Sequence, residues 1–329
     1  MNFAGIKDTG LNIWQKGMIS LARSEKVKNV MQGRGAMSAL STRFVGGRAA
    51  DGAAGNAWGL MEKSGILSSL FYLGEYVEDP EVIQQTLDAL SEMITRLGDT
   101  GLDIHVSVDP TQIGYQVSPD LCETHAFELA GRIRDAMPTV SSRQHHLLML
   151  DMEDLSVNQP TLDLYFKLLG ASLPVAVTLQ AYLFRTQKDL EKIIATGGTV
   201  RLVKGAFAES GDVAYTQSGD VDENFMNLAD MMLSSEARDN GFYPVFGTHD
   251  DRMIHRIIEL AVSRNWKPHE YEFEMLYGVR PAFQEILVKQ GATLRLYMPF
   301  GTDWWPYAVR RVGENPKNAG FLLKAMINR

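Results

Sequence analysis

Short apolar runs alternate with longer amphipathic segments from residue 66 onward. Eight runs rich in β-branched, aromatic and leucine side chains are bounded by turn residues, and we expect strands at 67–73, 104–108, 147–150, 175–179, 200–203, 243–246, 271–275 and 293–298. Apolar residues at helical spacing lie between them, and helices are expected over 80–97, 119–136 and 223–238, among others. Strand followed by helix, eight times, predicts an α/β fold of the closed (β/α)8 TIM-like barrel type.

The first 60 residues follow a different pattern. Apolar residues recur at roughly helical spacing within the first 40 residues, and residues 32–57 are rich in Gly, Ala and Ser, which suits a helix or a loop. Gly46, Gly47, Gly52 and Gly55 lack the spacing and the preceding strand of a dinucleotide fingerprint, so we assign them to packing. The expected organisation is an N-terminal helical extension over 1–60 and a barrel domain over 61–329.

Composition narrows the classes of partner. The 329 residues carry a net charge of −8, which disfavours nucleic acid as a partner. The single cysteine, Cys122, excludes an internal disulfide or a CxxC metal site, is expected to fill space in a helix, and fits a cytoplasmic location. No stretch of about 18 apolar residues is present, so we expect no membrane span, while peripheral contact stays open.

Polar residues occur at or just after every predicted strand. Because the active site of such a barrel lies at the carboxyl ends of its strands, these residues are expected to face one mouth. In chain order they are Glu75; Asp109, Thr111 and Gln112; Asp151, Glu153 and Asp154; Gln180; Arg201 and Lys204; Thr248, His249 and Asp250; Glu272 and Glu274; and Arg295 and Tyr297. Any one of them could be a solvated loop residue or a cap, but all eight groups together predict a polar site.

The segment after strand eight predicts a further helix. Pro306 suits a first helical turn, and four residues then fall on one face at i, i+3, i+4 and i+7: Tyr307, Arg310, Arg311 and Glu314. Two guanidiniums on one face form a clamp for a carboxylate or a phosphate, although a solvated amphipathic face would show the same pattern. Trp304 and Trp305 beside them favour a covered, apolar pocket.

Lys204 admits two interpretations. It leaves its strand with Gly205 and Ala206, where the backbone can approach a ligand and the ammonium can meet a phosphate or a ring oxygen. Alternatively, it is the Schiff-base lysine of an aldolase with Asp151 as acid–base partner. No metal site is expected, because HExxH spacing and Cys/His clusters are missing. His145 and His146, just before a strand, are assigned to the opposite, bottom face.

Several ordered motifs resemble one known family. They are LGE at 73–75, DME at 151–153, QAY at 180–182, RLVKGA at 201–206, THD at 248–250, FEMLYG at 273–278 and YxxRRxxE at 307–314. In this order they resemble proline dehydrogenase, most nearly the monofunctional bacterial type, over roughly residues 40–325. The most specific of them are RLVKGA and YxxRRxxE.

The resemblance implies a distorted (β/α)8 barrel that holds FAD non-covalently at its mouth and oxidises L-proline to 1-pyrroline-5-carboxylate by hydride transfer to flavin N5. It assigns catalysis to Asp151 and Arg201. It places FAD against Met152, Gln180, Arg201, Lys204, Gly205, Ala206, Thr248 and His249, and the substrate against Asp109, Tyr297, Tyr307, Arg310, Arg311 and Glu314. In the family, electrons pass to a membrane quinone, which implies a cytoplasmic protein with peripheral contact at the inner membrane.

One departure from the family bears on the substrate. Asp109 stands where the family usually has a lysine that helps to hold the substrate carboxylate, so a cation is replaced by an anion. Three interpretations follow: Asp109 turns away before Pro110, it pairs with Arg310 or Arg311, or the substrate is a proline analogue of different polarity. A non-catalytic barrel that binds proline or a flavin is a further alternative. Phe207 also replaces a family tyrosine, which removes a hydroxyl.

Overall fold

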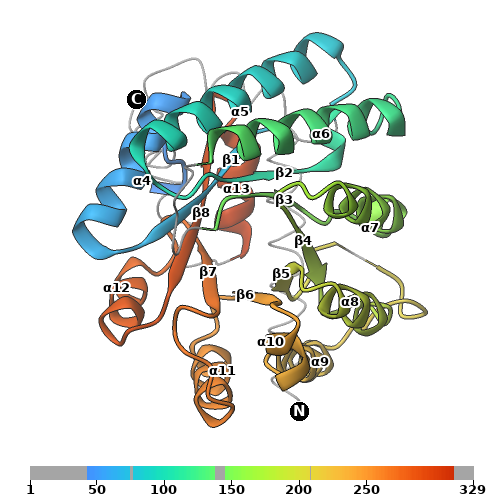
Figure 1. Cartoon of the computed structure of the whole chain (residues 1–329), viewed down its shortest axis with the longest axis vertical. Coiled ribbons are helices and arrows are strands. Elements are labelled where there is room, and N and C mark those ends of the chain that lie inside the picture. Colours follow the sequence, from blue (N-terminus) through green and yellow to red (C-terminus); the bar gives the residue numbers. More distant parts are fainter. Residues whose placement is uncertain (1–42, 75–76, 138–144, 208, 315–329) are drawn as a thin grey trace, which may run out of the picture.

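The computed structural model describes residues 43–74, 77–137, 145–207 and 209–314, with no account of the side chains of 310–314. Eight parallel strands form a closed barrel in the order β1-β2-β3-β4-β5-β6-β7-β8, which confirms the predicted fold class (Figure 1). The strands are β1 Leu67–Tyr72, β2 His105–Val108, β3 Leu147–Leu150, β4 Val175–Gln180, β5 Thr199–Val203, β6 Tyr243–Gly247, β7 Glu272–Leu276 and β8 Leu294–Phe300.

Helices surround the strands in chain order, from α5 through α12 (Figure 1). The described helices are α4 Ala50–Ser64, α5 Pro80–Thr100, the 3-10 helix η2 Pro110–Ile113, α6 Pro119–Ala136, α7 Leu155–Gly170, α8 Thr186–Ala195, α9 Ser218–Met232, α10 Ser235–Asp239, α11 Asp251–Ser263, α12 Pro281–Lys289 and α13 Trp305–Glu314. Among the described residues, no helix combines the length and the apolar character needed to cross a membrane.

The strand predictions are confirmed to within two residues at either end, and the helix predicted over 119–136 matches α6. The single helix predicted over 223–238 is wrong, because the chain breaks between α9 and α10. Ser234 causes the break: its backbone is extended and its hydroxyl accepts a hydrogen bond from Ala237 N at 3.1 Å, which starts a new helix.

The strands alternate between two environments. Outward-facing residues such as Leu148, Leu150 and Val177 are buried beneath the helices and form the main core. Inward-facing residues are unusually polar for a barrel interior: Ser69, Ser107, Arg201, Glu272, Glu274 and Arg295 are all buried. The fold therefore encloses a charged axis inside an apolar shell.

The segment before α4 packs against the last strand. Gly46 N donates to Pro299 O at 2.8 Å, and a Cβ on Gly46 would lie 2.3 Å from Met298. A Cβ on Gly47 would lie 2.5 Å from Ala53 N, so both glycines permit close packing. The expected N-terminal helix lies outside the described residues, and the boundary at 60/61, which falls within α4, stays a prediction.

Candidate active site at the barrel mouth

A cavity of about 550 Å³ opens at the carboxyl ends of the strands. Its volume falls in the range of small-molecule sites. Twelve of the fifteen predicted site residues line it: Asp109, Asp151, Met152, Gln180, Arg201, Lys204, Gly205, Ala206, Thr248, His249, Tyr297 and Tyr307. The mouth predicted from strand ends is therefore a single site.

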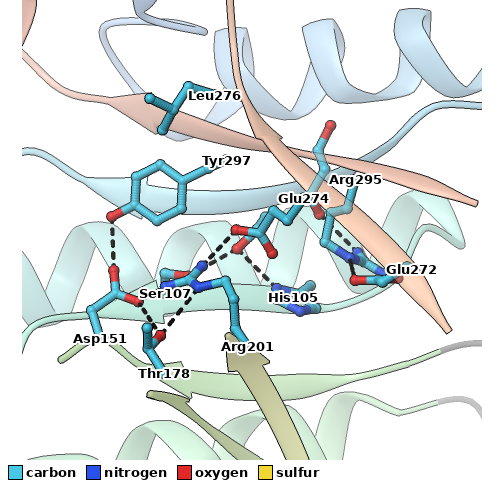
Figure 2. Close-up of polar contacts among 12 residues, drawn as sticks. His105, Ser107, Asp151, Thr178, Arg201, Glu272, Glu274, Leu276, Arg295 and Tyr297 are labelled. Carbon is cyan, nitrogen blue, oxygen red and sulfur yellow. Dashed lines mark hydrogen bonds and ion pairs between the residues drawn. The ribbon is translucent and has the colours of Figure 1, made fainter. Parts of the chain in front are cut away.

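Arg201 of β5 lies at the centre of the cavity floor. Its guanidinium pairs with Asp151 Oδ1 and donates to Glu274 Oε1 at 2.5 Å, while its Nε donates to Thr178 Oγ1 at 3.1 Å (Figure 2). The Arg201 side chain is 6% exposed. A buried guanidinium held by two carboxylates cannot swing away, so its positive charge is fixed beneath any ligand in the cavity.

Tyr297 of β8 is held by Asp151, the carboxylate that also pairs with Arg201. Its hydroxyl donates to Asp151 Oδ2 at 2.8 Å, and the Arg201 guanidinium carbon lies 5.2 Å from the centre of its ring. Burial first, and then the negative charge of Asp109, raises the pKa of Tyr297 well above its ordinary value. The phenol therefore stays protonated and serves as a donor to Asp151.

Asp109 faces the cavity. Its backbone N–H donates to Gln112 Oε1 at 3.3 Å, and Thr111 donates its hydroxyl to Glu153 at 2.6 Å and its backbone N–H at 3.1 Å, which fixes η2 behind it. Asp109 lines the cavity, and it also forms a capping box with Gln112 at the start of η2, so the three interpretations of its role stay predictions. An anion therefore belongs to the site.

The turn after β5 brings backbone into the cavity wall. Gly205 has a φ of 109°, and a Cβ there would lie 2.2 Å from the ring of Tyr182. Lys204 forms an ion pair with Asp222 of α9, and its Nζ is 3.8 Å from Asp250 Oδ2. The Lys204 side chain is 36% exposed, so it is a charged group at the rim.

Gln180 and His249 present polar atoms from neighbouring strands. Gln180 Nε2 donates to the carbonyls of Met152 at 3.3 Å and Glu153 at 3.1 Å. Its Oε1 is buried without a hydrogen-bond partner among the described residues. His249 Nε2 accepts from Leu276 N at 3.2 Å. Gln180, which lines the cavity, thus has an acceptor that no described residue satisfies.

Glu272 and Arg295 do not reach the mouth, so their prediction there is wrong. Arg295 is fully buried at the amino-terminal end of the barrel, with Nε 2.7 Å from Glu272 Oε1 and a guanidinium nitrogen 2.6 Å from Asp103 Oδ2. Both side chains point inward as alternation requires, but they sit near the starts of their strands, one layer below the cavity.

His105 of β2 lies between the two charged layers, where its Nδ1 is 2.9 Å from Ser69 Oγ. One nitrogen or oxygen from each of His105, Glu272 and Glu274 lies within 4.8 Å of the others. Burial, then Arg295 and Arg201, lowers the pKa of His105, so the ring is neutral. Since both carboxylates already pair with arginines, we assign this cluster to ion pairing and not to metal binding.

Helix α13 covers part of the cavity. Tyr307 lines it, and Trp304 and Trp305 are fully buried, which confirms the predicted apolar surroundings. Arg310 and Arg311, with Glu314, belong to α13 as expected, but their side chains lie outside the described part of the structure. The arginine clamp stays a prediction, as does any pairing with Asp109. Glu75 is also outside the described residues.

Two structural assignments are confirmed. Cys122 in α6 is 1% exposed, and burial raises the pKa of its thiol to about 12, as befits a core residue. His145 stacks on Tyr243 with ring centres 3.8 Å apart, and His146 Nδ1 accepts from Ile104 N at 2.9 Å, both at the bottom of the barrel.

Phe71, Thr178 and Leu276 also line the cavity and were not singled out from sequence, whereas Asp250 and Glu274, which were expected at the mouth, do lie there. Glu274 was expected at the mouth but was given no individual role. The alternation of β7, with Phe273 in the outer core, could have pointed it inward.

Comparison with known proteins agrees with this arrangement. The sequence model described as proline dehydrogenase matches residues 56–324. Proline dehydrogenase 2 of Bacillus subtilis (strain 168) is 34% identical over 267 residues, which cover 81% of this chain and 84% of that protein. Proline dehydrogenase of Deinococcus radiodurans is 29% identical over 96% of this chain and 98% of that protein.

A solved structure shares the fold. Proline utilization A from Bdellovibrio bacteriovorus superposes with a TM-score of 0.75 at 21% identity, over 88% of this chain. This chain spans about a third of that longer one, 34% of its length. The family match and the identity to bacterial relatives together show that the chain belongs to the proline dehydrogenase family and is an enzyme of that family.

Proposed function

We propose that this enzyme oxidises L-proline to 1-pyrroline-5-carboxylate with FAD bound at the barrel mouth. The observation that carries the proposal is the buried unit of Asp151, Arg201 and Tyr297 on the floor of a 550 Å³ cavity, in a chain of the proline dehydrogenase family. FAD, when bound, supplies the acceptor for a hydride from the ring carbon next to the substrate nitrogen.

The residues present fit a flavin. The buried Gln180 Oε1 offers an acceptor to a ring N–H, and Lys204 at the rim offers a cation to a phosphate or ring oxygen. The turn at Gly205 brings backbone into the wall. We propose that these residues hold the cofactor together with Met152, Arg201, Ala206, Thr248 and His249.

The floor of the cavity is suited to orient the reactants. Arg201 would stabilise negative charge that develops above it, because a fixed guanidinium in a water-poor site needs no reorganisation. Tyr297, held by Asp151, would pack against the substrate ring and limit its orientation. Asp151 acts on both, since it pairs with Arg201 and accepts from Tyr297.

The substrate carboxylate needs a cation. We propose that Arg310 and Arg311 provide it from α13, near Tyr307 and Glu314. Asp109 places a negative charge at the same cavity, so proline affinity depends on how that charge is balanced. An analogue with an additional hydrogen-bond donor is the alternative substrate that Asp109 would favour.

The aldolase alternative is disfavoured by Lys204. A Schiff-base lysine is activated by desolvation or by a neighbouring cation, whereas Lys204 is partly exposed and lies beside the carboxylates of Asp222 and Asp250. We also propose a membrane quinone as electron acceptor, and a cytoplasmic protein in peripheral contact with the inner membrane. The family resemblance is the support for the quinone acceptor, the cytoplasmic location and the membrane contact.

The decisive experiment is spectroscopic. Purified protein is expected to be yellow and to lose its flavin absorption when proline is added without oxygen. Parallel titrations with hydroxyproline and pipecolate identify the preferred ring. A colourless protein that borohydride traps with a carbonyl compound would support the aldolase, and a yellow protein that no cyclic amino acid bleaches would support the non-catalytic barrel.

A further inference from the structure

Glu274 of β7 combines deep burial with an unpaired oxygen. Its side chain is 3% exposed, and its Oε1 accepts from Arg201 at 2.5 Å (Figure 2). Its Oε2 is buried and has no hydrogen-bond partner among the described residues. A buried carboxylate oxygen without a donor is costly, because it has lost water and gained nothing.

The three other carboxylates around the two buried arginines use both oxygens. Their donors are Arg201 and Tyr297 for Asp151, Arg295 twice for Glu272, and Arg295 and the backbone N–H of His145 for Asp103. Among these four, Glu274 alone has an oxygen that no described group donates to. It is therefore the carboxylate where an added proton breaks no existing hydrogen bond.

The charges of the barrel axis also favour such a proton. Arg201 and Arg295 face four carboxylates, and His105 between the layers is neutral. The groups that interact with Glu274 are Arg201 from β5, Arg295 and Tyr297 from β8, Glu272 from β7 and His105 from β2, and Asp151 from β3 shares its partner Arg201. An excess of buried negative charge is unfavourable, and one proton reduces it.

We propose that Glu274 carries a proton on Oε2 in the resting protein, and that it acts as a positioning residue which leaves Asp151 as the only charged counter-ion of Arg201. Burial raises the pKa of Glu274, Arg201 lowers it by less, and Glu272 raises it further. The raised pKa of Glu274 agrees with its buried, unpartnered Oε2.

This state has a consequence for the chemistry above Arg201, which rests on the proposed function. With Glu274 neutral, the guanidinium directs more of its positive charge into the cavity and better stabilises a reduced, negatively charged ligand. When Glu274 ionises, a second negative charge offsets that effect. The flavin midpoint potential is therefore expected to fall more steeply with pH while Glu274 loses its proton.

The first test needs no cofactor. Thermal unfolding of flavin-free protein is compared for wild type, Glu274→Gln and Glu272→Gln between about pH 5 and about pH 9. The folded pKa of Glu274 is raised above its ordinary 4.5, so its contribution to stability is present below that value and lost as pH rises through the folded pKa. Gln cannot ionise and keeps the shape of the protonated acid.

We expect Glu274→Gln to gain stability relative to wild type as pH rises, whereas Glu272→Gln, which removes a fully paired carboxylate, is destabilised throughout. A uniform loss of stability in Glu274→Gln, equal to that in Glu272→Gln, would show an ionised pair with Arg201 and overturn the proposal. If Glu272→Gln fails to fold, infrared spectroscopy of wild type and Glu274→Gln still shows whether Glu274 is protonated.

Infrared spectra of wild type at neutral pH are expected to contain a buried carboxylic acid C=O band that shifts in D2O and is lost in Glu274→Gln. No such band, or a metal ion that co-purifies in wild type and is lost in Glu274→Gln, would also overturn the proposal.

In flavin-loaded protein, the extra pH dependence of the flavin midpoint potential should disappear in Glu274→Gln. A protein without flavin refutes the proposed function, and the unfolding and infrared results then still test whether Glu274 is protonated.

Discussion

At the scale of single residues, charge pairing inside the barrel differs in kind from charge pairing outside it. Arg295 is fully buried between Glu272 and Asp103, whereas Arg96 pairs with Asp51 at 2.7 Å with its side chain 45% exposed. Water already solvates the outer pair, so breaking it costs little. Loss of the inner cation leaves two carboxylates without a counter-charge.

Arg295→Met is therefore expected to lower the free energy of unfolding by about 3–5 kcal/mol. The matched change Arg96→Met should cost about 0–1 kcal/mol. Urea denaturation of both variants measures the difference. Equal small losses would mean that the axis of the barrel is solvated and that its ion pairs resemble those of the surface.

A second residue-scale prediction concerns Tyr297. Tyr297→Phe keeps the ring over Arg201 but removes the donor to Asp151 Oδ2, and an acceptor left without its donor costs about 1–3 kcal/mol. Because Asp151 also holds Arg201, we expect a loss in kcat/KM for proline of roughly tenfold to a hundredfold. Steady-state kinetics with a dye acceptor measure it, and an unchanged kcat/KM would remove this hydrogen bond from the working site.

At the scale of elements, the turn after β5 shows how backbone conformation shapes the cavity. Gly205 combines a positive φ with a close approach to Tyr182. Gly205→Ala should introduce backbone strain of about 1–3 kcal/mol and push the turn out of the cavity wall. Gly131→Ala, inside α6 with no atom within 4 Å of the new Cβ, should instead stabilise by about 1 kcal/mol.

Flavin content per protein, read from the visible spectrum, separates the two variants. Gly205→Ala should lose cofactor and Gly131→Ala should retain it. Full flavin content in Gly205→Ala would place the cofactor away from this turn.

The break between α9 and α10 yields a smaller prediction. Ser234→Ala removes the hydroxyl that caps α10 and should cost about 1 kcal/mol, while Ser235→Ala, exposed one residue later, should change little. Thermal unfolding measures both. The apolar periodicity continues through this break, which is why the pattern alone predicted one helix. The cap that separates α9 from α10 depends on the extended backbone of Ser234.

Strands, by contrast, were predictable because each is a short run, mostly of apolar residues, between turns. Their ends located the mouth, and twelve predicted residues meet there. Which layer an inward residue occupies was not predictable, because it depends on register around the closed ring: Arg295 pairs in register with Leu67 and Glu274. For that reason Glu272 and Arg295 were assigned to the wrong end, whereas Glu274, two residues after Glu272, was correctly expected at the mouth.

At the scale of the whole molecule, buried histidines link stability to pH. Burial is the largest cause of a lowered pKa at His105, His145 and His146; arginine charge lowers it further, and at His145 and His146 nearby carboxylates partly oppose the shift. In the unfolded chain each would take up a proton near its ordinary value of 6.5. The unfolded state therefore binds more protons than the folded state as pH falls from that value through the lowered folded values, and the free energy of unfolding declines across this window.

His146→Gln is expected to flatten this acid-side decline, because it removes one group that must charge on unfolding. It also weakens the contact with Ile104 N, so the variant should be less stable at pH above 7 and closer to wild type as pH falls. Thermal unfolding across a pH series tests this: a constant offset between His146→Gln and wild type would mean that His146 does not contribute to acid sensitivity. The remaining slope would then belong to His105 and His145.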